Sequence, residues 1–269
     1  MKTIVITGSS SGIGKATAKL FAEKGWQVAA TMRNPQKEVE LSTIENIRLY
    51  QLDVTDRASL DQATADILHD FGTVDVVLNN AGYGLAGPFE AISPEQIERQ
   101  FGTNVFGLMN VTRAFLPHFR KKGTGLFINV SSLGGVITYP FTSLYHSTKW
   151  AVEGFSESLS FELGELGIAV KLIEPGAVAT DFSGRSLEMV MPDNFPDYGP
   201  AAQKFMASMA SSDRVPAMAE EIASGIFEAA TDGKTQMRYP VGDAPQTIAM
   251  RRQVGDDAFI AGVRQQLFG

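Results

Sequence analysis

The sequence predicts a Rossmann-type, doubly wound α/β fold, with a mostly parallel, seven-stranded sheet covered by helices on both faces. Short apolar runs rich in β-branched residues alternate with longer segments of helical period along the chain. Several of these runs are almost continuously apolar, as strands buried on both faces require. A glycine-rich loop at residues 7–14 joins the first run to the first helical segment. These features favour one domain over residues 1–269.

Seven runs have the length and composition of strands. The expected strands span residues 3–7, 27–31, 48–52, 74–78, 125–130, 168–173 and 236–240. Among the helices between them, the first carries Ile13, Ala16 and Leu20 on one face and ends near a lysine and a glycine at residues 24–25. A capping box with proline at the first helical position begins a helix at residues 93–96, and a further helix is expected over about 143–165.

Residues 182–216 do not fit this alternation. The segment is rich in methionine and proline, and it shows no sustained period before about residue 201. Its methionines are Met189, Met191, Met206 and Met209, and its prolines are Pro192, Pro196, Pro200 and Pro216. It is too apolar for a linker and too irregular for a core element, so we expect a partly helical lid.

The composition excludes several classes of protein. The chain has no cysteine, which excludes disulfides, a thiolate nucleophile and cysteine-ligated metals. Its net charge of −7 and the lack of a basic cluster do not fit nucleic-acid binding. No apolar run reaches the roughly 18 residues of a membrane span, and the first residues lack the apolar core of a signal peptide. We therefore expect a cytoplasmic, soluble protein without a nucleic-acid or membrane partner.

The loop at residues 7–14 has the position and composition of a dinucleotide-binding loop. Its glycines permit a tight turn and a close approach of the backbone to a pyrophosphate, which the free N–H groups of the following helix stabilise. The alternative is a flexible glycine turn. The loop lacks the lysine-serine/threonine ending of an NTPase phosphate loop. The residues expected to contact the cofactor here are Gly8, Ser10, Ser11, Gly12, Ile13 and Gly14.

Other polar residues and turns follow the remaining expected strands. In order along the chain they are Arg33, Asp53 with Val54, the run of Asn79, Asn80, Ala81 and Gly82, the pair Ser131 and Ser132, and Pro175 with Gly176. Each could merely cap a helix or turn. Ligands of open α/β sheets bind beyond the carboxyl ends of the strands, however, and so many coincidences at one edge favour a site there.

The end of the second expected strand bears on the choice of dinucleotide. An acidic residue at this place would bind the ribose 2′-hydroxyl of NAD, whereas an arginine accepts the 2′-phosphate of NADP. The chain has Arg33 and no acid here. This favours NADP(H), with NAD(H) as the other possibility, because Arg33 could also be a solvated cation.

Tyr145 and Lys149 lie four residues apart and so share one face of a helix. A free tyrosine has a pKa near 10. Lowering it to about 7 needs roughly 4 kcal/mol, which a cation about 4 Å away supplies at an effective dielectric constant near 20. Lys149 is therefore a candidate to tune Tyr145 as a general acid and base. The alternative is a half-buried tyrosine beside a lysine that extends to solvent.

Taken together, these residues resemble the short-chain dehydrogenase/reductase family over essentially residues 1–240. The resemblance rests on the loop at 7–14, Asp53, the Asn79–Gly82 run, Asn104, Ser132, Tyr145, Lys149, and Pro175 and Gly176 followed by Thr180. Tyr145 follows Ser132 by 13 residues, the usual family spacing, which favours Ser132 over Ser131.

The resemblance implies a role for each matching residue. Tyr145 is the expected general acid and base, Lys149 binds the nicotinamide ribose, and Ser132 binds the substrate oxygen. Asn104 is expected to hold a water in a proton relay. Asp53 is expected at the adenine, Asn80 and Gly82 at the adenosine half, and Val178 and Thr180 at the nicotinamide amide. No metal is needed, and we assign none to the three histidines: His69 and His118 are expected to be surface cations, and His146 is given no role.

The expected reaction is hydride transfer between NADP(H) and a carbonyl or secondary alcohol. Candidate pocket residues are Leu133, Val136, Tyr139, Phe141, Phe182 and Met189, which favour a bulky apolar substrate such as a steroid, retinoid or aromatic ketone. A 3-oxoacyl thioester and a non-catalytic dinucleotide sensor remain alternatives. The three residues between Gly8 and Gly12 argue against an epimerase or dehydratase. The resemblance also implies a homodimer or homotetramer formed through the helices that carry Asn104 and Tyr145.

Overall fold

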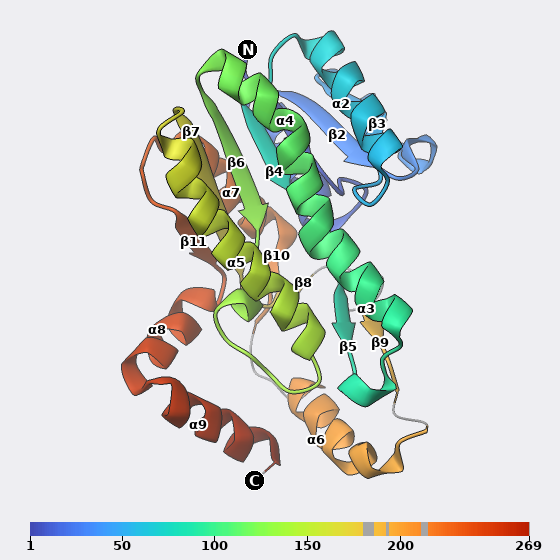
Figure 1. Cartoon of the computed structure of the whole chain (residues 1–269), viewed down its shortest axis with the longest axis vertical. Coiled ribbons are helices and arrows are strands. Elements are labelled where there is room, and N and C mark those ends of the chain that lie inside the picture. Colours follow the sequence, from blue (N-terminus) through green and yellow to red (C-terminus); the bar gives the residue numbers. More distant parts are fainter. Residues whose placement is uncertain (180–185, 192–193, 211–214, 269) are drawn as a thin grey trace.

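The computed structural model describes residues 1–179, 186–191, 194–210 and 215–268, and it contains the predicted seven-stranded sheet (Figure 1). The strands run in the order β11-β7-β6-β4-β1-β2-β3, and every neighbouring pair is parallel. Their bounds are β1 Thr3–Ile6, β2 Gln27–Met32, β3 Ile47–Gln51, β4 Val76–Asn79, β6 Gly125–Val130, β7 Ile168–Pro175 and β11 Arg238–Val241. The Rossmann-type α/β fold is therefore confirmed.

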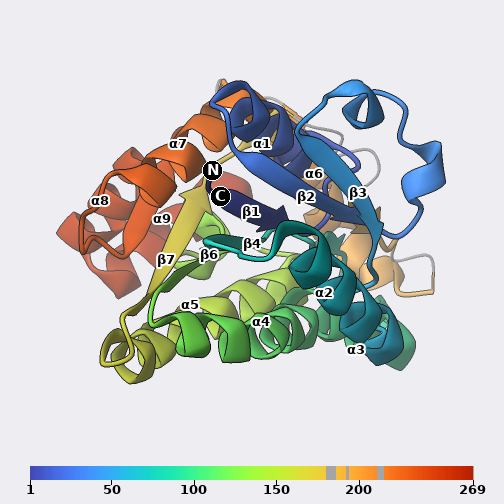
Figure 2. The ribbon, with the colours of Figure 1, turned by 90° about the horizontal axis from the view of Figure 1, so that it is seen from above.

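Helices cover both faces of this sheet, as Figure 2 shows from above. α1 (Gly12–Glu23) and α7 (Ala219–Thr231) lie on one face, and α2 (Arg57–Phe71), α4 (Leu108–Lys122) and α5 (Ser143–Gly164) lie on the other. The alternation of side chains along β1 explains why both faces are apolar. Ile4 packs in the same buried cluster as Phe21 of α1, and the next residue, Val5, packs with Phe115 of α4.

The helix boundaries follow from local capping chemistry. Asp56 caps α2 by accepting hydrogen bonds from the backbone N–H groups of the second and third residues that follow it. The predicted capping box of Ser93 and Gln96 is present at the start of α3 (Pro94–Phe101). The helix α1 ends at Glu23, next to the predicted lysine and glycine: Lys24 is its C-cap, and Gly25 follows with a φ of +79°.

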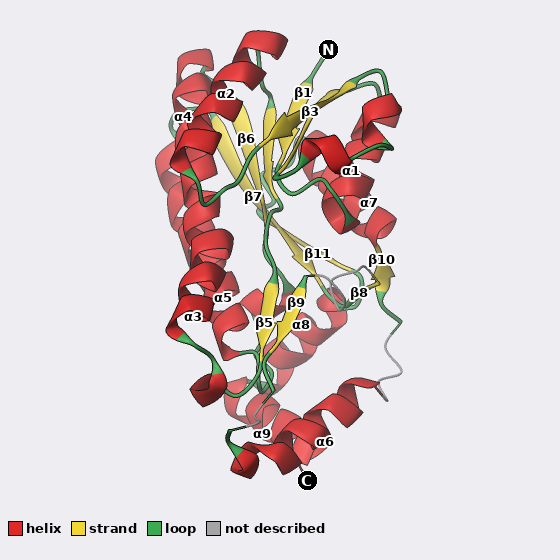
Figure 3. Cartoon of the chain, turned by 90° about the vertical axis from the view of Figure 1, so that its right-hand side faces the viewer, coloured by secondary structure: helices red, strands yellow, loops and turns green. Residues whose placement is uncertain are grey.

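Several elements lie outside the central sheet and were not predicted (Figure 3). β5 (Gly84–Ala86) pairs with β9 (Leu187–Met189), and β8 (Val178–Ala179) pairs with β10 (Ala217–Met218), each pair being parallel. The segment expected to be a partly helical lid contributes β9 and the helix α6 (Gly199–Ala210), while α8 (Ala244–Val254) and α9 (Asp256–Phe268) end the chain. Short 3₁₀ turns cover Pro35–Lys37, Leu41–Thr43, Phe89–Ala91, Leu133–Gly135 and Pro196–Tyr198.

The described ranges contain neither a helix of membrane-spanning character nor a metal-binding cluster of side chains. Among these residues no helix combines the length and apolar character needed to cross a bilayer. Nor does the described part of the chain bring together three histidine or acidic side chains in a group that could hold a metal ion.

Candidate active site

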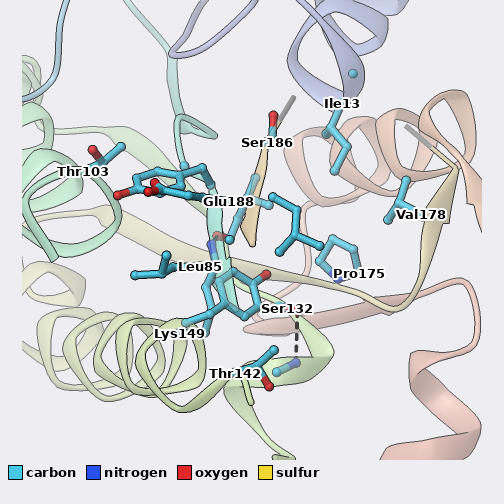
Figure 4. Close-up of a pocket in the computed structure, with 18 of the residues that line it drawn as sticks. Ile13, Leu85, Thr103, Ser132, Thr142, Lys149, Pro175, Val178, Ser186 and Glu188 are labelled. Atoms are coloured by element: carbon cyan, nitrogen blue, oxygen red, sulfur yellow. Dashed lines mark hydrogen bonds between the residues drawn. The ribbon is translucent and has the colours of Figure 1, made fainter. Parts of the chain in front are cut away.

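The carboxyl ends of the strands open into one large cleft with a volume of about 2170 Å³. This volume is larger than the roughly 300–1,000 Å³ of a typical small-ligand pocket. The predicted residues that line it are Gly8, Ser10, Ser11, Gly12, Ile13, Arg33, Asp53, Val54, Asn80, Ala81, Gly82, Ser132, Leu133, Tyr139, Tyr145, Lys149, Pro175, Gly176 and Val178. The chain thus brings together residues from six strand ends, and several of these residues are visible in Figure 4.

The glycine loop closes tightly against the turn after β4. Gly8 has a φ of +71°, and a Cβ there would lie 3.0 Å from the Ala81 Cα. The Thr7 hydroxyl accepts hydrogen bonds from the backbone N–H groups of Asn80 and Ala81, at 2.9 and 3.0 Å. Gly14 does not line the cleft: a Cβ there would lie 2.4 Å from the Gly8 carbonyl oxygen. The absence of a side chain at Gly14 lets the first turn of α1 pack closely against the glycine loop.

The first turn of α1 fits a phosphate group. The first N–H groups of a helix have no partner within it and carry the positive end of the helix dipole. Ser11 stands at the N-cap position in an extended conformation, and its side chain caps no helical N–H. Ser11, Gly12 and Ile13 all line the cleft, so the N-terminus of α1 faces the space that a pyrophosphate would need.

Arg33 and Asp53 lie at the rim of the same part of the cleft. Arg33 is exposed, and within the described ranges no carboxylate forms an ion pair with it. Lys15 of α1 differs, because its Nζ forms an ion pair with Glu38 at 3.0 Å. The Asp53 carboxylate accepts bonds from the backbone N–H and the hydroxyl of Thr55, at 2.9 and 2.7 Å. Asp53 therefore forms the turn foreseen as its alternative role, while still facing the cleft.

Tyr145 and Ser132 meet at the centre of the cleft. Ser132 is the second residue after the end of β6. Its hydroxyl oxygen accepts a hydrogen bond from the Gly134 N–H at 3.0 Å (Figure 4). Burial raises the pKa of the Tyr145 phenol, and the hydrogen bond with Ser132 acts in the opposite direction. The phenol is therefore protonated at neutral pH and can act as a proton donor.

Lys149 lies beside Tyr145, as the i, i+4 spacing predicted, and its effect on the pKa of Tyr145 stays a prediction. Its Nζ lies 5.8 Å from the centre of the Tyr145 ring and donates a 2.8 Å hydrogen bond to the Val130 carbonyl oxygen. Burial lowers the pKa of Lys149 itself to about 8, while the charge of Glu153 raises it. Burial acts on Tyr145 in the opposite direction, because it raises the pKa of the phenol, and the i, i+4 spacing alone does not reveal this burial.

Asn104 lies behind the cleft wall. It belongs to a π-helical turn, Gly102–Gly107, that joins α3 to α4. Its side-chain carbonyl accepts from the Tyr83 N–H at 3.0 Å, and its amide donates to the Tyr83 carbonyl at 2.9 Å and to the Thr148 hydroxyl at 3.1 Å. These contacts hold the cleft-lining backbone of Tyr83 to the helix of Tyr145. The water-relay role expected of Asn104 stays a prediction.

The candidate substrate residues separate into groups. Leu133 and Tyr139 line the main cleft, while Val136 packs beside them against the apolar cluster of Ile248 and Phe259. Phe141 and Met189 instead line a separate hollow of about 20 Å³ with Phe205, which touches both spaces. Thr180 and Phe182 lie outside the described residues.

His146 is a site residue that the sequence reasoning left out. Its ring is buried beside the cleft, with Nδ1 2.8 Å from the Gly134 carbonyl oxygen and Nε2 accepting the Tyr139 N–H at 3.0 Å. These bonds connect the loop after Ser132 to the helix of Tyr145 at the residue beside it. Burial lowers the pKa of His146. No sequence pattern indicates this role, because the two bonded backbone groups depend on the course of the loop.

Other cleft residues also escaped prediction. These are mainly the groups from β5, β9, α6 and the end of α9, namely Leu85, Ser186, Leu187, Glu188, Phe205, Gln266 and Leu267. The expectation for His118 was wrong: its Nε2 accepts the Val74 N–H at 3.1 Å, and burial lowers its pKa, so the ring is not a surface cation. His69 is exposed in the last turn of α2, as expected.

Residues 2–190 match the family of short chain dehydrogenases. The chain belongs to this family. The short-chain dehydrogenase is 39% identical over 237 residues to an uncharacterised oxidoreductase of Schizosaccharomyces pombe, an alignment that covers 88% of this chain and 99% of that protein. It is 35% identical over 246 residues to retinol dehydrogenase 8 of Homo sapiens, covering 83% of this chain and 78% of the human protein.

Solved structures place this short-chain dehydrogenase in the same fold. A short-chain dehydrogenase from Streptomyces avermitilis has a TM-score of 0.82 at 31% identity, covering 98% of this chain and 95% of that one. ElxO with NADP bound has a TM-score of 0.75 at 27% identity, covering 91% and 99%. The 3-ketoacyl-(acyl-carrier-protein) reductase from Brucella melitensis with NADH has a TM-score of 0.74 at 26% identity, covering 89% and 96%. Solved relatives thus hold either NADP or NADH.

Proposed function

We propose that the protein transfers a hydride between NADP(H) and a carbonyl or secondary alcohol, with Tyr145 as the general acid and base. The observation that carries this proposal is the meeting of Ser132, Tyr145 and Lys149 in a cleft whose other end is formed by the glycine loop and the N-terminus of α1. In a doubly wound fold a dinucleotide binds along this edge of the sheet with its pyrophosphate at the helix N-terminus, and its nicotinamide would then lie near Tyr145.

The chain's own groups account for the proton and for the charge that develops on oxygen. Bound NADPH would supply the hydride. The Tyr145 hydroxyl, protonated at neutral pH, gives its proton to the carbonyl oxygen, and the Ser132 hydroxyl donates a hydrogen bond to the same oxygen. Lys149, buried beside the tyrosine, binds the ribose and stabilises the phenolate left behind.

The lining of the substrate end favours a bulky apolar carbonyl, such as a steroid, retinoid or aromatic ketone. Leu85, Leu133, Leu187, Phe205 and Leu267 supply apolar surface there. The similarity to retinol dehydrogenase 8 supports the same class, since that relative is named for an apolar alcohol. Segment 182–216 is proposed as the substrate lid, because α6 and β9 within it contribute residues to the cleft.

Arg33→Asp tests the cofactor assignment. The exposed guanidinium at the end of β2 lacks an acidic partner within the described ranges, so it is open to bind a 2′-phosphate. An aspartate there repels that phosphate and accepts a bond from a ribose hydroxyl. We expect the ratio of kcat/KM for NADPH to that for NADH to fall at least about 100-fold, equivalent to roughly 3 kcal/mol. Arg48→Asp, at an exposed site on β3, is the control for a change in surface charge. An unchanged ratio in Arg33→Asp would remove Arg33 from the cofactor site.

Two alternatives make different predictions. A 3-oxoacyl-thioester reductase would turn over acetoacetyl thioesters rapidly and apolar ketones slowly; the similarity to the Brucella melitensis reductase keeps this alternative open. A dinucleotide sensor would bind NADPH without oxidising it in the presence of any carbonyl. Because Tyr145 and Lys149 are both present and lie in the cleft, the enzyme is the better-supported proposal.

We further propose a homodimer or homotetramer formed through α4, α5 and the π-helical turn. These elements expose large aromatic side chains: Phe106 is 58% exposed, Trp150 46% and Phe161 75%. Burying such surface in a symmetric contact is the usual solution in homo-oligomers. A cytoplasmic location stays a prediction from the sequence.

A further inference from the structure

A group of buried charges lies one helical turn beyond Lys149. Glu153 follows Lys149 by four residues on α5, so Tyr145, Lys149 and Glu153 succeed one another along one face of the helix. Glu153 is 6% exposed, and Glu174, near the end of β7, is 2% exposed. Buried carboxylates are costly unless they are paired, so two of them together need an explanation.

Arg238 of β11 lies between the two glutamates. Its Nε is 3.0 Å from Glu153 Oε2 and 3.4 Å from Glu174 Oε1, and its Nη2 binds the exposed Glu157 at 2.6 Å. One guanidinium therefore faces two buried carboxylates, and its shorter contact is with Glu153. A second cation, Arg252 of α8, also acts on Glu174, because its positive charge lowers the pKa of that carboxyl group.

One oxygen of each glutamate is buried and accepts no hydrogen bond from the described residues. These atoms are Glu153 Oε1 and Glu174 Oε1, and the second forms only the 3.4 Å ion pair with Arg238 Nε. Two ionised carboxylates cannot satisfy each other, whereas a carboxylic acid can donate to a carboxylate. Burial and the neighbouring charge of Glu153 raise the pKa of Glu174, and the two arginines act in the opposite direction. The proton therefore belongs on Glu174, and the charge belongs on Glu153, at the shorter contact with Arg238.

We propose that Glu153 is a positioning residue that holds the positive charge on Lys149, and that Glu174 keeps Glu153 ionised by carrying the proton the two glutamates share. Lys149 is buried, and its Nζ donates a hydrogen bond to a neutral carbonyl oxygen. Among the described residues no carboxylate forms an ion pair with Lys149, so no direct contact offsets the cost of burying its charge. Glu153 is the acidic group that raises the pKa of Lys149. This inference rests on the proposed function, in which the charge on Lys149 assists Tyr145.

The direct test is the titration of Lys149 in Glu153→Gln. The ε-carbon signal of labelled lysine, assigned by its loss in Lys149→Met, gives the pKa without any turnover. We expect the pKa of Lys149 to fall by about one pH unit in Glu153→Gln. Glu157→Gln is the matched control, because it removes another carboxylate that binds Arg238 one turn further along α5. Glu153→Asp keeps the charge and is expected to keep most of the wild-type pKa.

The same variant has a kinetic signature that loss of packing would not produce. Since the wild-type pKa of Lys149 is about 8, a one-unit fall leaves Lys149 almost fully charged at pH 6. At pH 8 it lowers the charged fraction about fivefold. We therefore expect carbonyl reduction by Glu153→Gln to approach the wild-type rate at pH 6 and to be about fivefold slower at pH 8. If no carbonyl is reduced by the wild-type protein, the proposed function fails, while the lysine titration still tests the role of Glu153.

The second half of the proposal is tested by infrared spectroscopy at pH 6, below the value of about 7 to which burial and the charge of Glu153 raise the pKa of Glu174. The wild-type protein should show the carbonyl stretch of a buried, protonated carboxyl group, and Glu174→Gln should lack it. That variant should also leave the pKa of Lys149 unchanged, because glutamine resembles the protonated side chain. Absence of the band in the wild-type protein would overturn the assignment of the proton. An unshifted Lys149 titration in folded Glu153→Gln, or an equal fall in Glu153→Asp, would overturn the role of Glu153.

Discussion

Tyr145→Phe is expected to lower kcat for carbonyl reduction by about 10³-fold or more, because general acid catalysis contributes roughly 10²–10⁴-fold. The variant removes only the hydroxyl, which forms the hydrogen bond with Ser132 and carries the proton at neutral pH. The ring remains, so the cleft keeps its shape. NADPH binding, followed by quenching of protein fluorescence, should change less than about threefold.

Tyr50→Phe is the matched control for this prediction. Tyr50 lies on β3, and its hydroxyl donates to Asp70 at 2.7 Å, so the variant also loses one buried hydroxyl. It should cost about 1 kcal/mol of stability and leave kcat unchanged. If Tyr145→Phe kept most of the wild-type activity, Tyr145 would not be the proton donor, and the proposed mechanism would be wrong.

Lys149→Met is expected to make the protein more stable at pH 7 while it loses most of its activity. Burial lowers the pKa of Lys149 from 10.5 to about 8. The unfolded chain therefore binds the proton more tightly, and the charged lysine costs about 3 kcal/mol of folding free energy below pH 8. Methionine removes this cost but leaves the Val130 carbonyl without its donor, a loss of about 1 kcal/mol. The net gain in the free energy of unfolding should be about 2 kcal/mol.

The lowered pKa of Lys149 also predicts how the stability difference between Lys149→Met and the wild type depends on pH. Between pH 8 and 10.5 the unfolded wild-type chain binds more protons than the folded one, so the wild-type protein gains stability as the pH rises through this range. The advantage of Lys149→Met should therefore be largest below pH 8 and shrink above it. Urea unfolding at pH 7 and pH 9.5 measures both values. A variant less stable than the wild type at pH 7 would contradict the cost assigned to the buried charge.

The sequence predicted the central sheet because each of its strands carries a local signal. In β1, Ile4 and Ile6 pack on one face of the sheet and Val5, between them, packs on the other. A strand that is buried on both faces requires such a continuous apolar run. The polar residues at the strand ends were likewise readable in order along the chain, and most of them line the cleft. Local sequence patterns are thus sufficient to predict the architecture and the edge of the sheet at which the site forms.

Features that depend on contacts between distant segments were not readable. β5 and β9 are three residues long and are stabilised by pairing across about a hundred residues of chain, so neither has a pattern of its own. The effect of burial on Tyr145 and Lys149 depends on the whole surrounding core, and the i, i+4 spacing predicts only their proximity. Glu153 and Glu174 meet through β7 and α5 in the same way.

The proposed function requires the cleft to reduce carbonyl groups with NADPH. An activity screen that pairs steroid, retinoid, aromatic and acetoacetyl-thioester carbonyls with NADPH and with NADH, and follows oxidation of each cofactor, tests this requirement. We expect oxidation of NADPH in preference to NADH, with the highest kcat/KM on a bulky apolar carbonyl. Tight NADPH binding without oxidation by any member of the panel would contradict it.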